Sequence, residues 1–118
     1  MKPKINIDTH IIKKHKVMLA YLFGSRAKGN AANYSDFDIA VLFFEESNTV
    51  ADFFDKTVYL KEDLRDYFPN EVDLVALNSA NSLLKYEVIA NAQLIYVKNA
   101  YAQRVFDTTF TIRAGFWV

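Results

Sequence analysis

The chain has 118 residues, 52% of them hydrophobic, and its 14 lysines and arginines balance 14 aspartates and glutamates. This length and apolar content exclude a disordered chain and are sufficient for one compact domain over residues 1–118. The net charge of zero gives no broad attraction to phosphate polymers, so we expect no direct nucleic-acid partner. The chain has no cysteine, no apolar run of the roughly 20 residues that span a bilayer and no resemblance to a signal peptide at its start. A cytoplasmic protein without membrane contacts is therefore expected.

The basic, amphipathic stretch near the amino terminus predicts a helix over residues 9–16. His10 and His15 both lie on it, before the first predicted strand. We interpret them as surface residues rather than catalysts, and the charged run over residues 13–16 as a solvated helix face.

Residues 17–23 are apolar throughout, which predicts a strand buried on both faces. Gly24 and Ser25 end this strand and precede a short helix predicted over residues 26–30. Glycine lets a ligand approach the backbone closely, and serine offers a hydroxyl and an N–H, so this turn is a candidate phosphate-binding site. Arg26 could grip phosphate oxygens through its planar guanidinium. Taken alone, such a turn is more typical of an ordinary connection between a strand and a helix.

A polar stretch over residues 29–35 leads into a second predicted strand over residues 36–43. Because side chains alternate along a strand, Asp36 and Asp38 project to the same side. At about 4 Å and an effective dielectric of about 20, two carboxylates repel by on the order of 4 kcal/mol, which a divalent cation would reverse. Carboxylate oxygens suit Mg²⁺, which shares its remaining positions with water and substrate phosphates. The alternative is that Asp36 is a turn or cap residue and Asp38 a solvated edge residue.

Apolar residues at helical spacing predict a long helix over residues 49–67, which Pro69 stops. We expect its apolar stripe to pack on the sheet. The stripe consists of Val50, Phe53, Phe54, Thr57, Val58, Leu60 and Leu64.

A third strand is predicted over residues 70–77, and Asp73 lies inside it. If this strand pairs beside the second, Asp73 completes a three-carboxylate site and can accept the proton of an attacking hydroxyl. Glu71 lies on the same face but nearer the turn, so we prefer Asp73. The alternative is that Asp73 merely begins a strand at a solvent-exposed end.

Asn78 and Ser79 are predicted to cap a helix over residues 80–90, and a short strand follows over residues 94–97. The composition of residues 101–118 fits either a helix or a strand. This tail is rich in large apolar side chains, so it either closes over the core, which we favour, or forms part of a partner interface.

Together, Gly24, Ser25, Asp36, Asp38 and Asp73 resemble the signature of the DNA-polymerase-β-like nucleotidyltransferase superfamily. The similarity covers residues 17–96. Its more specific first half, residues 24–29 and 34–41, is similar to the minimal nucleotidyltransferases of the MntA type, the antitoxins that are paired with HEPN-domain toxins of the HepT type. The resemblance implies an α/β (α+β) fold in which helices flank a small mixed β-sheet.

The resemblance also implies an activity, namely the transfer of AMP from ATP to a tyrosine hydroxyl on a cognate HEPN-type ribonuclease toxin, with two Mg²⁺ ions. In this chain Gly24 and Ser25 would hold the triphosphate, and Arg26 would stabilise charge on the phosphates. The two aspartates of the second strand would bridge the metals. Asp73 would bind the catalytic metal and help to activate the acceptor.

Two alternatives stay open. One is an antitoxin that neutralises its partner by binding alone. The other is a transferase with a small, aminoglycoside-like acceptor. The short chain favours a protein acceptor, because it has little beyond the catalytic core with which to hold a small molecule. The sequence leaves open the nucleotide base, the acceptor hydroxyl, the number of groups transferred and the stoichiometry of any complex.

Overall fold

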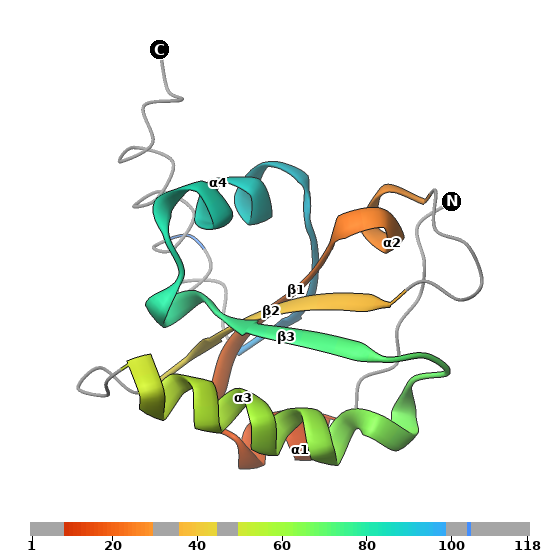
Figure 1. Ribbon diagram of the computed structural model, residues 1–118, viewed down its shortest axis with the longest axis vertical. Helices are drawn as coiled ribbons and strands as arrows, with labels where there is room; N and C mark the ends of the chain where they lie inside the picture. Colours follow the sequence, from red (N-terminus) through yellow and green to blue (C-terminus); the bar gives the residue numbers. More distant parts are fainter. Residues whose placement is uncertain (1–8, 30–35, 45–49, 99–103, 105–118) are drawn as a thin grey trace.

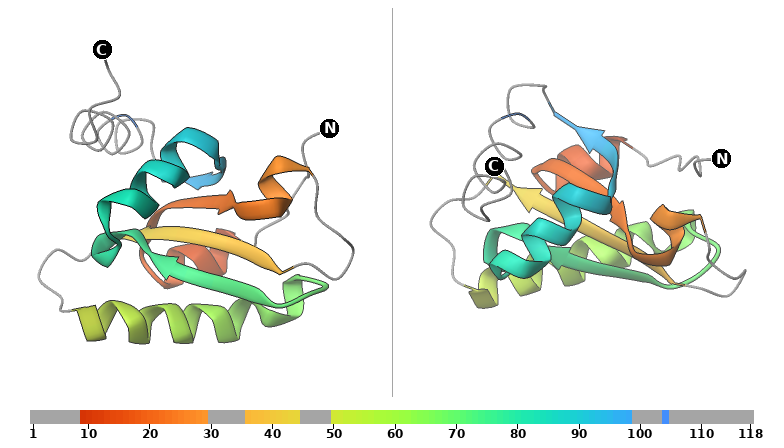
Figure 2. Two further views of the ribbon diagram at one scale, coloured as in Figure 1. Left: turned by 45° about the horizontal axis from the view of Figure 1, so that its top comes forward. Right: turned by 90° about the horizontal axis from the view of Figure 1, so that it is seen from above.

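The computed structural model describes residues 9–29, 36–44, 50–98 and 104. Four strands form one sheet in the order β3-β2-β1-β4, with helices on both faces (Figures 1 and 2). Strand β1 (Val17–Phe23) pairs antiparallel with β2 (Phe37–Phe43) and with β4 (Gln93–Val97), whereas β2 pairs parallel with β3 (Val72–Ala76). The predicted mixed sheet flanked by helices is therefore confirmed.

Strand β1 has the predicted bounds, and its inner position in the sheet explains its apolar composition. Leu19 and Tyr21 belong to the apolar core on one face of the sheet, and Ala20 and Leu22 belong to the core on the other. Because both faces of β1 are covered, neither set of alternating side chains meets water.

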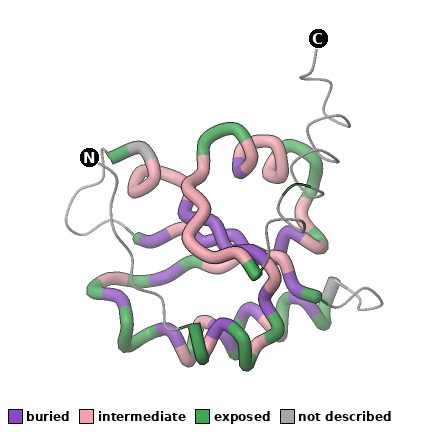
Figure 3. Tube along the Cα trace, turned by 180° about the vertical axis from the view of Figure 1, so that it is seen from behind, coloured by how far each residue is buried: buried purple, intermediate pink, exposed green. Residues whose placement is uncertain are grey.

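Helices α1 (Thr9–Lys14) and α3 (Val50–Leu64) cover one face, and a 3-10 turn, η1 (Arg65–Tyr67), follows α3. The stripe on α3 is narrower than predicted, because Phe54 and Val58 are 66% and 47% exposed. Figure 3 shows buried and exposed positions alternating along this layer. The buried side chains of the stripe are Phe53, Thr57, Leu60 and Leu64. Their spacing of three or four residues already covers the side of the helix that faces the sheet, so the two neighbouring apolar residues remain outside.

The two histidines differ in burial. His10 is exposed, as predicted, whereas the side chain of His15 is only 14% exposed. The imidazole Nε2 of His15 lies 2.7 Å from Oδ2 of Asp63 in α3, and this contact lowers the pKa of the Asp63 carboxyl. The pair joins α1 to α3, which gives His15 a structural place in the fold.

Helices α2 (Gly24–Lys28) and α4 (Ser82–Asn91) lie on the other face, where a 3-10 turn, η2 (Leu77–Ser79), precedes α4. Helix α2 begins two residues earlier than predicted and ends at Gly29, whose φ of +77° is left-handed. The predicted Asn78-Ser79 cap of α4 is wrong. The Asn78 amide instead bonds the backbone N–H and C=O of Phe43 at 2.8 and 3.0 Å, and Asn81 caps the helix by accepting from the Leu84 N–H.

Several predictions fall outside the described residues. The polar turn is described only at Gly29 and the tail only at Arg104, so the choice between helix and strand for residues 101–118 stays a prediction. In the part of the chain that the structure describes, no helix combines the length and the apolar character that crossing a membrane requires.

Candidate active site

The turn after β1 is pressed against a carboxylate of the neighbouring strand. Phe23, the last residue of β1, pairs with Asp38 of β2, and Gly24 follows with a φ of +72°. A Cβ atom on Gly24 would overlap the Asp38 carboxylate. Only glycine therefore lets this turn pass so close to Asp38 while keeping a left-handed backbone. Ser25, the second residue of α2, comes next in the chain.

A second carboxylate reaches the same place through the parallel ladder between β2 and β3. Asp38 is the register partner of Asp73, so the two lie side by side on adjacent strands. Both project to the face that carries α4, because their neighbours Ala40 and Val75 belong to the apolar core there. Asp36 lies two residues before Asp38, immediately ahead of β2. The predicted pairing of the second and third strands is thus confirmed.

The electrostatics of the cluster follow from this arrangement. Asp36 and Asp73 are exposed, and Asp38 is partly buried. Burial raises the pKa of the Asp38 carboxyl, and the negative charges of Asp73 and then Asp36 raise it further. Asp73 and Asp36 therefore both lie close enough to Asp38 for their charges to act on it. A cluster of like charges held by backbone pairing favours the binding of a cation.

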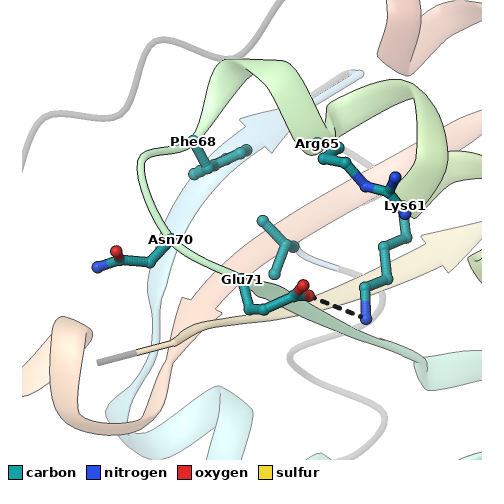
Figure 4. A pocket seen from close by; sticks show the side chains of 6 residues that line it. Lys61, Arg65, Phe68, Asn70 and Glu71 are labelled. Carbon is teal, nitrogen blue, oxygen red and sulfur yellow. Dashed lines mark ion pairs between the residues drawn. The ribbon is translucent and has the colours of Figure 1, made fainter. Parts of the chain in front are cut away.

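Glu71, the alternative to Asp73, lies apart from this cluster. Its carboxylate pairs with Nζ of Lys61 in α3 at 3.4 Å, while its carbonyl oxygen accepts the N–H of Phe37 at 2.8 Å. Together with Arg65 and Phe68 it lines a cavity of about 150 Å³ beside α3 (Figure 4). The ion pair with Lys61 (Figure 4) draws the Glu71 carboxylate towards α3, which covers the face of the sheet opposite to that of Asp73.

The side chain of Arg26 contacts an aromatic ring of β2. The central carbon of its guanidinium stands 4.1 Å from the centre of the Phe37 ring. Phe37 belongs to the core beneath the sheet, on the α3 side, whereas Asp38, the next residue of β2, projects the other way. The guanidinium is therefore stacked on an aromatic ring at the beginning of β2.

A groove runs along β3 from the residue that follows Asp73. It has a volume of about 430 Å³ and lies between α3 and α4. Phe54 and Thr57 form one wall, and Ala80 and Leu84 form part of the other; the floor is made by Leu74, Val75 and Ala76. The groove was not predicted from the sequence. The feature that could have indicated it is the width of the apolar stripe on α3, which includes the exposed Phe54.

The donors present suit Mg²⁺, since all three are carboxylates. Among the described residues, however, no group of three or more Asp, Glu, His or Cys side chains converges closely enough to enclose a metal ion. Mg²⁺ usually takes only one or two carboxylates from the protein and completes its shell with water and substrate phosphates. An open site built around Asp38, with the candidate phosphate-binding turn beside it, would fit this mode of coordination.

Comparison with known families decides the class of this fold. The model of the polymerase beta nucleotidyltransferases matches residues 6–101. The chain belongs to this family. It is therefore a nucleotidyltransferase, as its motifs indicated, and the turn and carboxylates described above lie within the matched part.

Two curated relatives of this nucleotidyltransferase bear names of the same activity. A Methanocaldococcus jannaschii protein assigned provisionally as a protein adenylyltransferase is 37% identical over 82 residues, which cover 70% of this chain and 83% of the relative. The protein adenylyltransferase MntA of Shewanella oneidensis is 33% identical over 81 residues. That match covers 69% of this chain but 55% of MntA.

Solved structures of the same fold include antitoxins in complex with their toxins. A toxin–antitoxin complex with AMP-PNP has a chain that is 26% identical to this nucleotidyltransferase, with a TM-score of 0.71 over 90% of this chain and 82% of that one. Complexes of a HEPN toxin with its MNT antitoxin and of MntA with HepT also share the fold. The resemblance to the MntA-type antitoxins is thereby confirmed.

Proposed function

We propose that this nucleotidyltransferase is an antitoxin that transfers AMP from ATP to a tyrosine hydroxyl of a partner HEPN-type ribonuclease toxin. The observation that carries the proposal is the position of Asp38, which has Gly24 against its carboxylate and Asp73 beside it on the next strand. The turn at Gly24, which suits a phosphate, thus lies beside Asp38 and Asp73, whose carboxylates suit a metal ion. The AMP-PNP complex and the adenylyltransferase relatives support the nucleotide and the reaction.

In this proposal Gly24 lets the triphosphate approach the backbone, and Ser25 contributes its hydroxyl and its N–H. Arg26 adds positive charge near the phosphates. Asp36 and Asp38 would hold Mg²⁺, which would supply positive charge against the phosphate oxygens. By holding the metal ion that contacts the phosphates, Asp36 and Asp38 would also orient the nucleotide.

The reaction itself needs one proton acceptor. The tyrosine oxygen attacks the α-phosphorus of ATP, the new P–O bond forms, and the bond to pyrophosphate breaks. Asp73 is exposed and lies beside Asp38 in the ladder, so it can accept the hydroxyl proton from an acceptor that approaches from solvent. The reaction requires no covalent intermediate with this chain.

A protein acceptor also needs a surface on which to rest. The groove along β3 begins at Leu74, directly after Asp73, and its walls carry apolar side chains. A partner segment lying along this strand would bring a neighbouring hydroxyl to Asp73. The groove therefore favours a protein acceptor, whose own surface can fill the walls, over a small molecule.

The test is intact-mass spectrometry of the protein encoded beside this one, after incubation with this chain, ATP and Mg²⁺. We expect a mass gain in AMP units, localised to a tyrosine by peptide mapping. The variant Asp36→Asn/Asp38→Asn should lose it. A matched control is Asp55→Asn/Asp66→Asn, which removes two exposed aspartates elsewhere and should keep it.

Two results would contradict the proposal. A tight complex with no mass gain would mean that the protein neutralises its partner by binding alone. An equal mass gain with both double variants would mean that Asp36 and Asp38 do not take part in the transfer.

A further inference from the structure

The ring of Phe37 lies between two groups from distant parts of the chain. Its centroid is 5.0 Å from that of Phe68, with the ring planes inclined by 56°, and the guanidinium carbon of Arg26 lies 4.1 Å from its centre. Phe37 and Phe68 are only 7% and 9% exposed. The stack therefore joins α2, the first residue of β2 and the segment that follows η1.

This stack touches both halves of the candidate site. Phe37 is the residue between Asp36 and Asp38, so its orientation sets the backbone from which both carboxylates project. Its N–H is fixed to the carbonyl of Glu71, which aligns β2 with β3. Arg26 directly follows Ser25 in the turn. Phe37 thus contacts Arg26, which follows the Gly24-Ser25 turn, and its backbone lies between Asp36 and Asp38.

The chemistry of the stack suits this task. A guanidinium is planar, and stacking uses its face while its N–H donors point outward along its edge. An aromatic ring beneath it limits the rotamers of the arginine without consuming those donors. A leucine at the same position would fill much of the volume but offer no such face.

We propose that Phe37 is a positioning residue for nucleotide binding: it holds Arg26 beside the Gly24-Ser25 turn and holds the backbone between Asp36 and Asp38. The ring projects to the face of the sheet opposite to that of Asp38, so it acts on the site through its own backbone and through Arg26, which stacks on it. The inference rests on the proposed function only in placing the nucleotide at this turn and these carboxylates.

Strand β2 supplies a matched control at its other end. Phe43 projects to the same face, is 2% exposed, stacks on Phe53 at 6.3 Å and has Nζ of Lys56 5.8 Å from its ring. Phe43→Leu therefore removes the same kinds of contact as Phe37→Leu, but at a position five residues along the chain from Asp38. Thermal denaturation shows whether the two variants lose comparable stability.

The experiment measures the Kd of AMP-PNP with Mg²⁺ by calorimetry and the KM for ATP in AMP transfer. We expect Phe37→Leu to weaken nucleotide binding about fivefold to tenfold and Phe43→Leu to change it less than about twofold. Arg26→Met should weaken binding to a similar degree. In the Phe37→Leu background it should add little, because both changes remove the same interaction.

Equal losses of affinity in the two leucine variants, or additive losses for Phe37→Leu and Arg26→Met, would overturn the inference. Phe37→Met provides a second variant that fills the site without an aromatic face, and it should reproduce the affinity loss if Phe37→Leu does not fold. The binding measurement also separates the two proposals. A wild-type protein that binds AMP-PNP but modifies no partner would refute the proposed acceptor, while the role of Phe37 would still be decided by the Kd values.

Discussion

Gly24 leaves no room for a side chain in front of Asp38, because a Cβ atom at that position would overlap the carboxylate. Gly24 directly follows β1, Asp38 lies in β2, and the pairing of Phe23 with Asp38 brings the two together. The shape of the turn and the position of the carboxylate are therefore coupled, and a change in either one should disturb the other.

Gly24→Ala should abolish nucleotide binding and destabilise the fold by roughly 1–3 kcal/mol, because the new methyl group displaces Asp38 and the left-handed backbone becomes strained. The control is Gly29→Ala. Gly29 also has a positive φ, +77°, but no atom lies within 4 Å of a Cβ placed there. Urea denaturation and AMP-PNP calorimetry should show a stability loss in both variants and a loss of binding in the first alone. Normal nucleotide binding by Gly24→Ala would show that the close approach to Asp38 has no role in the site.

Asp73→Asn should lower AMP transfer at least about a hundredfold while leaving the complex with the partner intact, since it removes the proposed proton acceptor. Glu71→Gln provides the comparison, because Glu71 pairs with Lys61 away from the cluster. Its exposed ion pair contributes at most about 1 kcal/mol, so this variant should stay close to wild type. Single-turnover rates of transfer measure both. If Glu71→Gln shows the larger loss of rate, the assignment of the third carboxylate is wrong.

Asp38→Asn should raise the Tm of the nucleotide-free and metal-free protein by a few degrees at neutral pH while it abolishes transfer. The pKa of Asp38 is raised in the folded protein by burial and by the other two carboxylates, so the ionised form opposes folding. The stability that the wild type has below the unfolded pKa of about 3.9 is lost as the pH rises through the higher folded pKa. The Tm difference between variant and wild type should therefore shrink towards zero near pH 3. A Tm difference that does not change between pH 3 and pH 7 would contradict this electrostatic origin.

Phe54→Ser should weaken the complex with the partner protein about tenfold or more if the groove along β3 receives it, because Phe54 is a large exposed side chain in the groove wall. Tyr59→Ser is the control on the same helix, since Tyr59 is equally exposed, at 68%, but lies outside the groove. Calorimetric titration with the partner measures both affinities, and AMP-PNP binding should be unchanged in both. Equal affinity losses would place the partner elsewhere.

Much of the fold was predictable because the order of apolar and polar residues along a segment indicates which of its faces are buried. The apolar run of β1, flanked by polar residues, gave its exact length because an inner strand has no solvent-exposed face. Alternation over the predicted strand put Asp38 and Phe37 on opposite sides, as the structure has them, while Asp36 lies just ahead of β2. The helices were found with errors of a few residues at their ends.

The incorrect predictions concern positions at which neighbouring residues could equally well fill the same structural role. Asn78 and Asn81 are both suitable caps for α4, and the choice went to Asn81 because Asn78 bonds the backbone of Phe43, 35 residues away. Phe54 and Val58 fit the helical stripe of α3, but they remain exposed beside the residues of α3 that are buried against the sheet. Neither outcome can be read from the residues adjacent in sequence.

By itself, the sequence determined which residues could form the site: a glycine that permits a left-handed turn, a serine after it, and carboxylates at alternating positions of a strand. Those are properties of single residues and of backbone periodicity. Only the tertiary structure decided that Asp73 rather than Glu71 stands beside Asp38, and that the guanidinium of Arg26 stacks on Phe37. Strand register and side-chain stacking depend on the competition among distant segments for the same backbone groups and the same buried surface, so they exist only once the sheet has formed.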